Sequence, residues 1–257
     1  MLTVRAAAFY AGYTLVTIVW GTLGTVFGWL VPYRLRFRLI IGCWTWLCLK
    51  WLQVTCGIRH RVVGLERVPE RPCIVLCRHE STWETLFLQQ LFAPQATLIK
   101  RELLRIPFFG WAFRTLRPIA IDRRAQRKAL RTLIEQGRAR LQDCIWVALF
   151  PEGTRMPPGQ LGRFQPGGAA LAAATGAPIV VVVHNAGSFW PAHQFHKYPG
   201  EITVIIGEPI ATTGLGTKEI QAAIASAFES LMVCLPRPEL HQAPAPAKAA
   251  TAAKRPD

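Results

Sequence analysis

The sequence has 257 residues, which is long enough for one sizeable domain and an appendage. Lysine and arginine outnumber aspartate and glutamate by 30 to 15, giving a formal net charge of +15, and 51% of the residues are hydrophobic. A chain that is both basic and apolar favours an anionic membrane surface or an anionic lipid as its partner. The sequence contains neither zinc-finger spacing nor the RNA-binding signature, so nucleic acid is not an expected partner.

The N-terminal segment is apolar enough to enter a bilayer. Residues 6–33 carry no charged side chain and exceed the ~20 residues needed to cross a ~30 Å hydrocarbon core. A second apolar stretch, 39–58, is rich in tryptophan and is interrupted by Lys50. That interruption favours a helix in the interface, or the second arm of a shallow hairpin, over a simple second span.

The charges that flank the first apolar stretch predict its orientation. Three arginines follow the stretch, namely Arg34, Arg36 and Arg38. If the stretch spans the membrane, the positive-inside bias places the remaining chain in the cytoplasm. We therefore expect residues 1–59 to be membrane-associated helices of an inner or plasma membrane, with the rest of the chain, from residue 60 on, facing the cytoplasm. Spanning the bilayer and entering a single leaflet both remain open.

From about residue 60, short apolar and β-branched runs alternate with helix-like segments. The strand candidates are 61–64, 73–77, 97–100, 118–121, 145–150, 178–184 and 202–206. The helix candidates are 82–92, 108–116, 124–141, 167–176 and 217–235. This alternation predicts an α/β domain over 60–235, with a mostly parallel or mixed sheet covered by helices. The tail 236–257 is rich in proline and alanine and is expected to be disordered.

Positive charge concentrates between residues 100 and 140. In the helix candidate 124–141, arginine and lysine form one stripe, and Leu130, Ile134 and Leu141 lie on another. Two interpretations of the basic stripe are equally good, a solvated helix face and a surface that meets anionic lipid headgroups.

The seven cysteines form no secreted pattern, and we expect buried free thiols in a reducing compartment. Cys73 and Cys77 would need a second pair to bind a metal ion, and none is in reach. The pair His193 and His196 suggests a zinc hydrolase only weakly, because the sequence lacks HExxH. No metal site is therefore expected.

The stretch RHESTWET places His79 at the carboxyl end of a strand candidate, where open α/β sheets usually bind their ligands. Glu84 could accept a hydrogen bond from one ring nitrogen and leave the other as a base toward a hydroxyl. The same glutamate could instead complete a capping box with Ser81 at the start of a helix. The spacing alone does not decide between the two, and one glutamate is not expected to serve both partners at once.

Two further segments place arginine and acidic residues just after strand candidates, IAIDRR at 119–124 and LFPEGTRM at 149–156. Gly153 permits a tight turn whose backbone N–H groups can meet an anion. Arg155 can fork onto phosphate oxygens. Taken singly, each segment also fits a loop with a surface ion pair.

Taken in order, these motifs resemble a known family. They are His79-x4-Glu84, Ile121-Asp122-Arg123, Phe150-Pro151-Glu152-Gly153-Thr154-Arg155 and Ala177-Pro178-Ile179-Val180. They are similar to the four motifs of the glycerolipid acyltransferases, and most similar to those of bacterial 1-acyl-sn-glycerol-3-phosphate acyltransferases. The similarity covers roughly residues 60–210 and includes KREL at 100–103. Glu84 stands where that family usually has aspartate.

The resemblance implies roles for individual residues. His79 would be the general base and Glu84 its orienting carboxylate, with Lys100 stabilising the oxyanion. The phosphate of the acceptor would be held by Arg123, Glu152, Gly153, Thr154 and Arg155, with Glu152 positioning an arginine.

The resemblance also implies an activity. An acyl chain would pass from acyl-CoA or acyl carrier protein to the sn-2 hydroxyl of lysophosphatidic acid, giving phosphatidic acid without a further cofactor. Two alternatives remain, acylation of another lipid acceptor, such as a lyso-ornithine lipid or a lipid A precursor, and a non-catalytic basic module that binds membranes.

Overall fold

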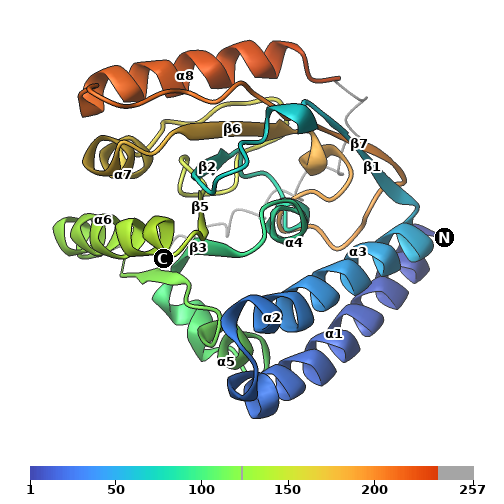
Figure 1. Ribbon diagram of the computed structural model, residues 1–257. Coiled ribbons are helices and arrows are strands. Elements are labelled where there is room, and N and C mark those ends of the chain that lie inside the picture. Colours follow the sequence, from blue (N-terminus) through green and yellow to red (C-terminus); the bar gives the residue numbers. More distant parts are fainter. Residues whose placement is uncertain (123, 237–257) are drawn as a thin grey trace, which may run out of the picture.

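The computed structural model describes residues 1–122 and 124–236. Arg123 and the predicted tail beyond Pro236 lie outside the described residues. The chain forms an α/β domain with a helical hairpin at its N-terminus (Figure 1).

The centre of the molecule is a seven-stranded sheet in the order β1-β7-β6-β2-β5-β3-β4. The strands are β1 (Ile58–Val63), β2 (Ile74–Cys77), β3 (Gln95–Lys100), β4 (Ile119–Ile121), β5 (Trp146–Leu149), β6 (Ile179–His184) and β7 (Gly200–Ile206). All neighbours pair in parallel except β6 and β7, which are antiparallel. The prediction of a mostly parallel or mixed sheet covered by helices is confirmed.

Helices cover both faces of the sheet (Figure 1). The helices of the α/β domain are α4 (Trp83–Leu91), α5 (Phe109–Arg114), α6 (Gln126–Gln142), α7 (Gly167–Thr175) and α8 (Thr217–Val233), with short 3₁₀ turns at Leu65–Arg67, Arg101–Arg105 and Ala186–Ser188. α6, α7 and α8 pack on one face, while α4 lies on the other beside the N-terminal hairpin.

The two faces of the sheet supply two separate apolar cores. Along β2, Val75 and Cys77 join the core under α4 and the hairpin, whereas Ile74 and Leu76 join the core under α7 and α8. Successive side chains of a strand point to opposite faces, so a continuous apolar run is what a sheet buried on both sides requires.

The N-terminal hairpin consists of α1 (Leu2–Phe27), a 3₁₀ turn (Gly28–Leu30), α2 (Tyr33–Phe37), a π-helical turn (Arg38–Gly42) and α3 (Cys43–Cys56). Two stretches are long and apolar enough to cross a membrane by length and composition, Leu2–Leu30 and Tyr33–Cys56. α3 runs without a break through Lys50, so this residue does not interrupt the second helix.

The hairpin is packed onto the α/β domain along much of its length. α1 contacts α3 and α5, and α3 contacts α4. At Gly21 a Cβ atom would lie 2.7 Å from the backbone carbonyl carbon of Phe108, closer than real Cβ contacts, so this glycine allows α1 to approach the start of α5.

Candidate active site

The predicted site residues lie at one edge of the sheet. β2, β5, β3 and β4 are parallel, so their carboxyl ends meet at the same edge. His79 follows β2, the segment 150–155 follows β5, and Lys100 is the last residue of β3. This is the edge at which open α/β sheets usually bind ligands.

His79 is held by a short hydrogen bond to Glu84. Nδ1 of the ring lies 2.7 Å from Oε1 of Glu84, and the ring stacks on Phe150 with 4.3 Å between centroids. The His79 side chain is 17% exposed, whereas that of Glu84 is fully buried. Because the carboxylate accepts at Nδ1, this nitrogen carries the proton and Nε2 keeps its lone pair.

Glu84 also organises the start of α4. Its Oε1 accepts hydrogen bonds from the backbone N–H groups of Ser81, at 2.9 Å, and Glu80, at 3.1 Å. Ser81 Oγ in turn accepts from the N–H of Trp83 at 3.1 Å, whereas a full capping box would use the N–H of Glu84, and the N-cap of α4 is Thr82. The expectation that one glutamate would not serve both partners is therefore wrong, because Oε1 accepts the ring N–H and the two backbone donors at the same time, with its two lone pairs shared among them.

The protonation state of Glu84 follows from these contacts. Burial on its own raises the pKa of this carboxyl, but the bond from His79, the nearby imidazole of His184 and the N–H of Ser81 outweigh it. The net pKa of Glu84 therefore lies below its usual value, and the side chain is an anion at neutral pH.

A second buried layer lies behind this pair. Arg78, which is fully buried, forms an ion pair with Glu80, and the other oxygen of Glu80 accepts the N–H of Gly187 at 3.0 Å. Burial raises the pKa of Glu80 to about 7, against the attraction of Arg78. Nε2 of the buried His184 donates to the Arg78 carbonyl at 2.9 Å, and its Nδ1 accepts from the N–H of Ala186. These contacts fix the backbone on either side of His79.

The segment after β5 turns back toward His79. Gly153 adopts a left-handed backbone conformation, with φ of +70°, which glycine accepts without strain. The side chain of Glu152 is 5% exposed and accepts the backbone N–H of His79 at 3.2 Å. Burial raises the pKa of Glu152 to about 7. Arg155 donates to the Ser81 carbonyl at 3.1 Å and to Thr82 Oγ1 at 3.0 Å.

A cavity of about 590 Å³ lies in front of His79. His79, Thr82, Lys100, Gly153, Thr154 and Arg155 line its polar part. Most of the remaining wall is apolar, and Tyr13, Thr17, Ile41 and Trp44 of the N-terminal hairpin form part of it. The hairpin is thus a wall of the site as well as an apolar appendage.

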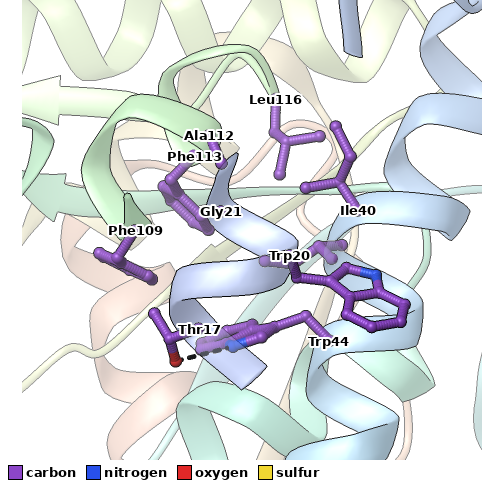
Figure 2. A pocket seen from close by; sticks show the side chains of 10 residues that line it. Thr17, Trp20, Gly21, Ile40, Trp44, Phe109, Ala112, Phe113 and Leu116 are labelled. Carbon is purple, nitrogen blue, oxygen red and sulfur yellow. Dashed lines mark hydrogen bonds between the residues drawn. The ribbon is translucent and has the colours of Figure 1, made fainter. Parts of the chain in front are cut away.

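A smaller hollow of about 20 Å³ adjoins the cavity between α1, α3 and α5 (Figure 2). The two share five lining residues, Thr17, Ile41, Trp44, Phe109 and Phe113. Trp44 of α3 donates from its indole N–H to Thr17 Oγ1 of α1 at 3.0 Å, which links the two helices of the hairpin at this hollow (Figure 2).

The structure brings most of the predicted residues to this cavity. His79, Lys100, Gly153, Thr154 and Arg155 all line it. Glu152 does not, because its carboxylate turns to the backbone of His79 instead of holding an arginine side chain. Among the described residues, no three His, Cys, Asp or Glu side chains gather as they would around a metal ion.

Several residues of the site were not predicted from the sequence. Phe150 stacks on His79, and His193 lines the cavity from the loop that follows β6. Phe150 is the first residue of the motif at 150–155, so the sequence already placed it close to the site. His193 stands out in the sequence only as a weak metal-binding pair with His196, and no motif links it to this cavity.

The fold and the site together define an α/β acyltransferase with a carboxylate-held histidine at the polar end of its cavity. The chain belongs to the acyltransferase family, whose family model matches residues 59–185. It is 45% identical over 217 residues to the 1-acyl-sn-glycerol-3-phosphate acyltransferase of Pseudomonas aeruginosa, which covers 84% of each chain.

More distant proteins show the same relationship. The human 1-acyl-sn-glycerol-3-phosphate acyltransferase beta is 29% identical over 86% of this chain and 81% of its own length. The crystal structure of the 1-acyl-sn-glycerophosphate (LPA) acyltransferase PlsC from Thermotoga maritima is similar in fold, with a TM-score of 0.75 and 23% identity. That similarity covers 90% of this chain and 95% of PlsC.

Proposed function

We propose that this enzyme transfers an acyl chain from a thioester donor to the sn-2 hydroxyl of 1-acyl-sn-glycerol-3-phosphate, giving phosphatidic acid. The observation that carries the proposal is the His79–Glu84 pair at the polar end of a largely apolar cavity. The name of the Pseudomonas aeruginosa relative supports this acceptor. Acyl-CoA and acyl carrier protein both supply the thioester that the reaction requires.

The reaction begins with removal of a proton. Nε2 of His79 takes the proton of the acceptor hydroxyl while its oxygen attacks the thioester carbonyl. The buried Glu84 carboxylate stabilises the imidazolium that forms. Collapse of the tetrahedral intermediate forms the ester bond, breaks the carbon–sulfur bond and releases the thiol, which takes the proton back from His79.

The negative charge of the tetrahedral intermediate requires a donor. Lys100 is exposed at the end of β3 and lines the same cavity as His79. Loss of one oxyanion donor typically raises the barrier by about 2.7–4 kcal/mol. We assign this role to Lys100, with backbone N–H groups as competitors.

The phosphate of the acceptor is assigned to Arg155 and the turn before it. Arg155 is anchored by Ser81 and Thr82, so its guanidinium is preorganised at the cavity. Gly153 and Thr154 line the cavity beside it. Arg123 stays the second cation that the sequence predicts for this role, and it lies outside the described residues. Glu152 contributes indirectly, by fixing the backbone of His79.

The apolar hairpin gives the site access to lipid. Because α3 packs against α4 and α1 against α5, immersion of the hairpin brings the cavity to the level of the bilayer. The arginines after the first helix favour the cytoplasmic leaflet. Both long acyl chains then reach the cavity from the membrane.

A direct assay tests the proposal. Membranes containing the enzyme are supplied with a radiolabelled acyl thioester, as acyl-CoA or acyl carrier protein, and with 1-acyl-sn-glycerol-3-phosphate, a lyso-ornithine lipid or a lipid A precursor. We expect labelled phosphatidic acid from the first acceptor only, and none from the His79→Ala variant. Equal labelling with His79→Ala contradicts the mechanism, and labelling of another acceptor contradicts the assigned substrate.

A further inference from the structure

Lys197 is a buried cation outside the catalytic motifs. Its side chain is 1% exposed, and its ammonium group is surrounded by four aromatic rings. The rings belong to Phe9, Tyr10, Trp190 and Phe195, at 3.9 Å from the Tyr10 centroid and 5.0–6.0 Å from the others. Such contacts attract a cation to the face of a ring.

The ammonium group also makes two directed hydrogen bonds. Nζ donates to the hydroxyl of Tyr10 at 2.7 Å and to the carbonyl of Phe195 at 2.8 Å. In the described part of the chain, no carboxylate lies within ion-pairing distance of Nζ. Burial lowers the pKa of Lys197 to about 8, so the ammonium form still predominates at neutral pH. Burying a cation without a carboxylate is costly, which indicates a role other than stability.

The contacts of Lys197 join two parts of the molecule that are far apart in sequence. Tyr10 and Phe9 lie on α1, in the hairpin, whereas Trp190 and Phe195 lie on the loop between β6 and β7. Phe9 packs edge-on against Trp190, with centroids 5.1 Å apart, and Tyr10 stacks on Phe195 at 5.3 Å. Lys197 therefore fixes where this loop sits on α1.

The same loop touches the catalytic motif. The carbonyl of Trp190 accepts a hydrogen bond from Ser81 Oγ at 2.7 Å. The N–H of Ser81 is one of the donors to Glu84 Oε1, the oxygen that holds His79. A continuous set of contacts thus runs from α1 through Lys197, Trp190 and Ser81 to the catalytic pair.

We propose that Lys197 is a positioning residue that couples the docking of α1 to the geometry of the His79–Glu84 pair. With its ammonium in the aromatic cage, the loop presents the Trp190 carbonyl to Ser81 and keeps Glu84 aligned with the His79 ring. The inference rests on the proposed acyl transfer and names a residue on which its rate depends.

The first test separates positioning from stability. Lys197→Met keeps the length of the side chain but removes the charge and both hydrogen bonds. Because replacement of a buried ion by an apolar side chain is often neutral or stabilising, we expect the unfolding temperature to stay level or rise. We expect kcat to fall about 10-fold or more, with the KM of both substrates unchanged within about twofold. Lys50→Met, at an exposed lysine of α3, is the matched control and should retain kcat.

A double-mutant cycle on kcat decides the outcome even if Lys197→Met loses stability. Lys197 and Ser81 share no hydrogen bond, so independent effects of Lys197→Met and Ser81→Ala should multiply. Under the proposal, the fold-decrease in kcat caused by Ser81→Ala is at least about threefold smaller in the Lys197→Met variant than in the otherwise unmodified enzyme. The reason is that the loop has already moved in Lys197→Met. Multiplicative effects, or an unchanged kcat in Lys197→Met, overturn it. Absence of phosphatidic acid synthesis by the unmodified enzyme would instead refute the proposed function.

Discussion

At the scale of single residues, the carboxylate of Glu84 accepts three hydrogen bonds through one oxygen, from the His79 ring and from the N–H groups of Glu80 and Ser81. The start of α4 and the orientation of the His79 ring therefore depend on the same atom. The local backbone determines the orientation of His79, and the buried ion pair between Arg78 and Glu80 holds this backbone in place. Preorganisation of this kind avoids rearrangement during the reaction.

Replacing Glu84 by glutamine separates its charge from its hydrogen bonds. The amide oxygen of Glu84→Gln can still accept the backbone N–H groups, so the start of α4 and the unfolding temperature should change little. The neutral amide cannot stabilise an imidazolium, and we expect kcat to fall by about 10²–10⁴. Glu135→Gln, on the exposed side of α6, is the control. A kcat near that of the unmodified enzyme would show that Glu84 acts only as a cap.

The raised pKa of Glu152 predicts that the stability of the protein depends on pH. Because its pKa is about 7 in the folded protein and 4.5 ordinarily, the folded state holds a proton that the unfolded state releases between those values. Its contribution to stability therefore falls as the pH rises from 4.5 to about 7. Glu152→Gln has no proton to lose and can still accept the His79 N–H. We expect the free energy of unfolding of Glu152→Gln, relative to that of the unmodified enzyme, to increase with pH, to a limit of about 3 kcal/mol.

Urea denaturation at about pH 5 and about pH 8 measures this difference. Glu66→Gln, at an exposed position, serves as the control, and its unfolding free energy relative to the unmodified protein should not increase with pH. A difference between Glu152→Gln and the unmodified protein that stays constant over this range would mean that Glu152 is ionised throughout.

At the scale of elements, α1 can approach α5 closely because Gly21 has no side chain. A Cβ at Gly21 would meet the carbonyl carbon and oxygen of Phe108, at 2.7 and 2.8 Å, and backbone cannot move aside as a side-chain tip can. We expect Gly21→Ala to displace α1, to lower the unfolding temperature and to reduce acyl transfer, because Thr17 on the same helix lines the cavity.

The neighbouring exposed position supplies the control for this substitution. Thr22→Ala also places alanine on α1 but faces outward, so both the unfolding temperature and the activity should be retained. If Gly21→Ala unfolds at the same temperature as Thr22→Ala, the close approach of α1 to α5 is not a constraint on the fold.

Much of the α/β domain is predictable because its signals are local. The apolar runs that become β2, β5 and β6 are continuous, and each is followed by the polar residues of a motif or a turn. Only half of the expected capping box is present, because Glu84 accepts the N–H of Ser81 but Ser81 Oγ bonds the N–H of Trp83 instead of that of Glu84. Register and order within the sheet place these ends together, which the resemblance to a known family also implies.

The contacts of the hairpin are not predictable in the same way. These contacts join residues that are far apart in the sequence. The sequence predicts apolar helices there but does not indicate which part of the domain they pack against. The wall that Tyr13 and Trp44 give to the cavity, and the cage that Tyr10 gives to Lys197, require knowing which face of each helix meets the domain. The dual role of Glu84 depends on a bond angle and distance that spacing alone does not reveal.

At the scale of the whole molecule, charge and apolar surface belong to different parts of one enzyme. The exposed large apolar side chains gather on the hairpin and include Leu15, Leu23, Val26, Phe27 and Trp29. The arginines and lysines of α6 and of the segment 100–105 lie on the α/β domain. In the membrane-bound enzyme that we propose, insertion by the hairpin and attraction of the domain to anionic headgroups would act together.

The shared wall of the cavity has a consequence for the modularity of the enzyme. A tether that only kept the domain near lipid could be exchanged for any other tether of similar hydrophobicity. Here the N-terminal hairpin supplies Tyr13, Thr17, Ile41 and Trp44 to the wall of the cavity that we propose receives the substrates. A chimaera with a foreign anchor would reach the membrane with an incomplete substrate chamber, so anchor and catalytic domain must evolve, and be engineered, as one unit.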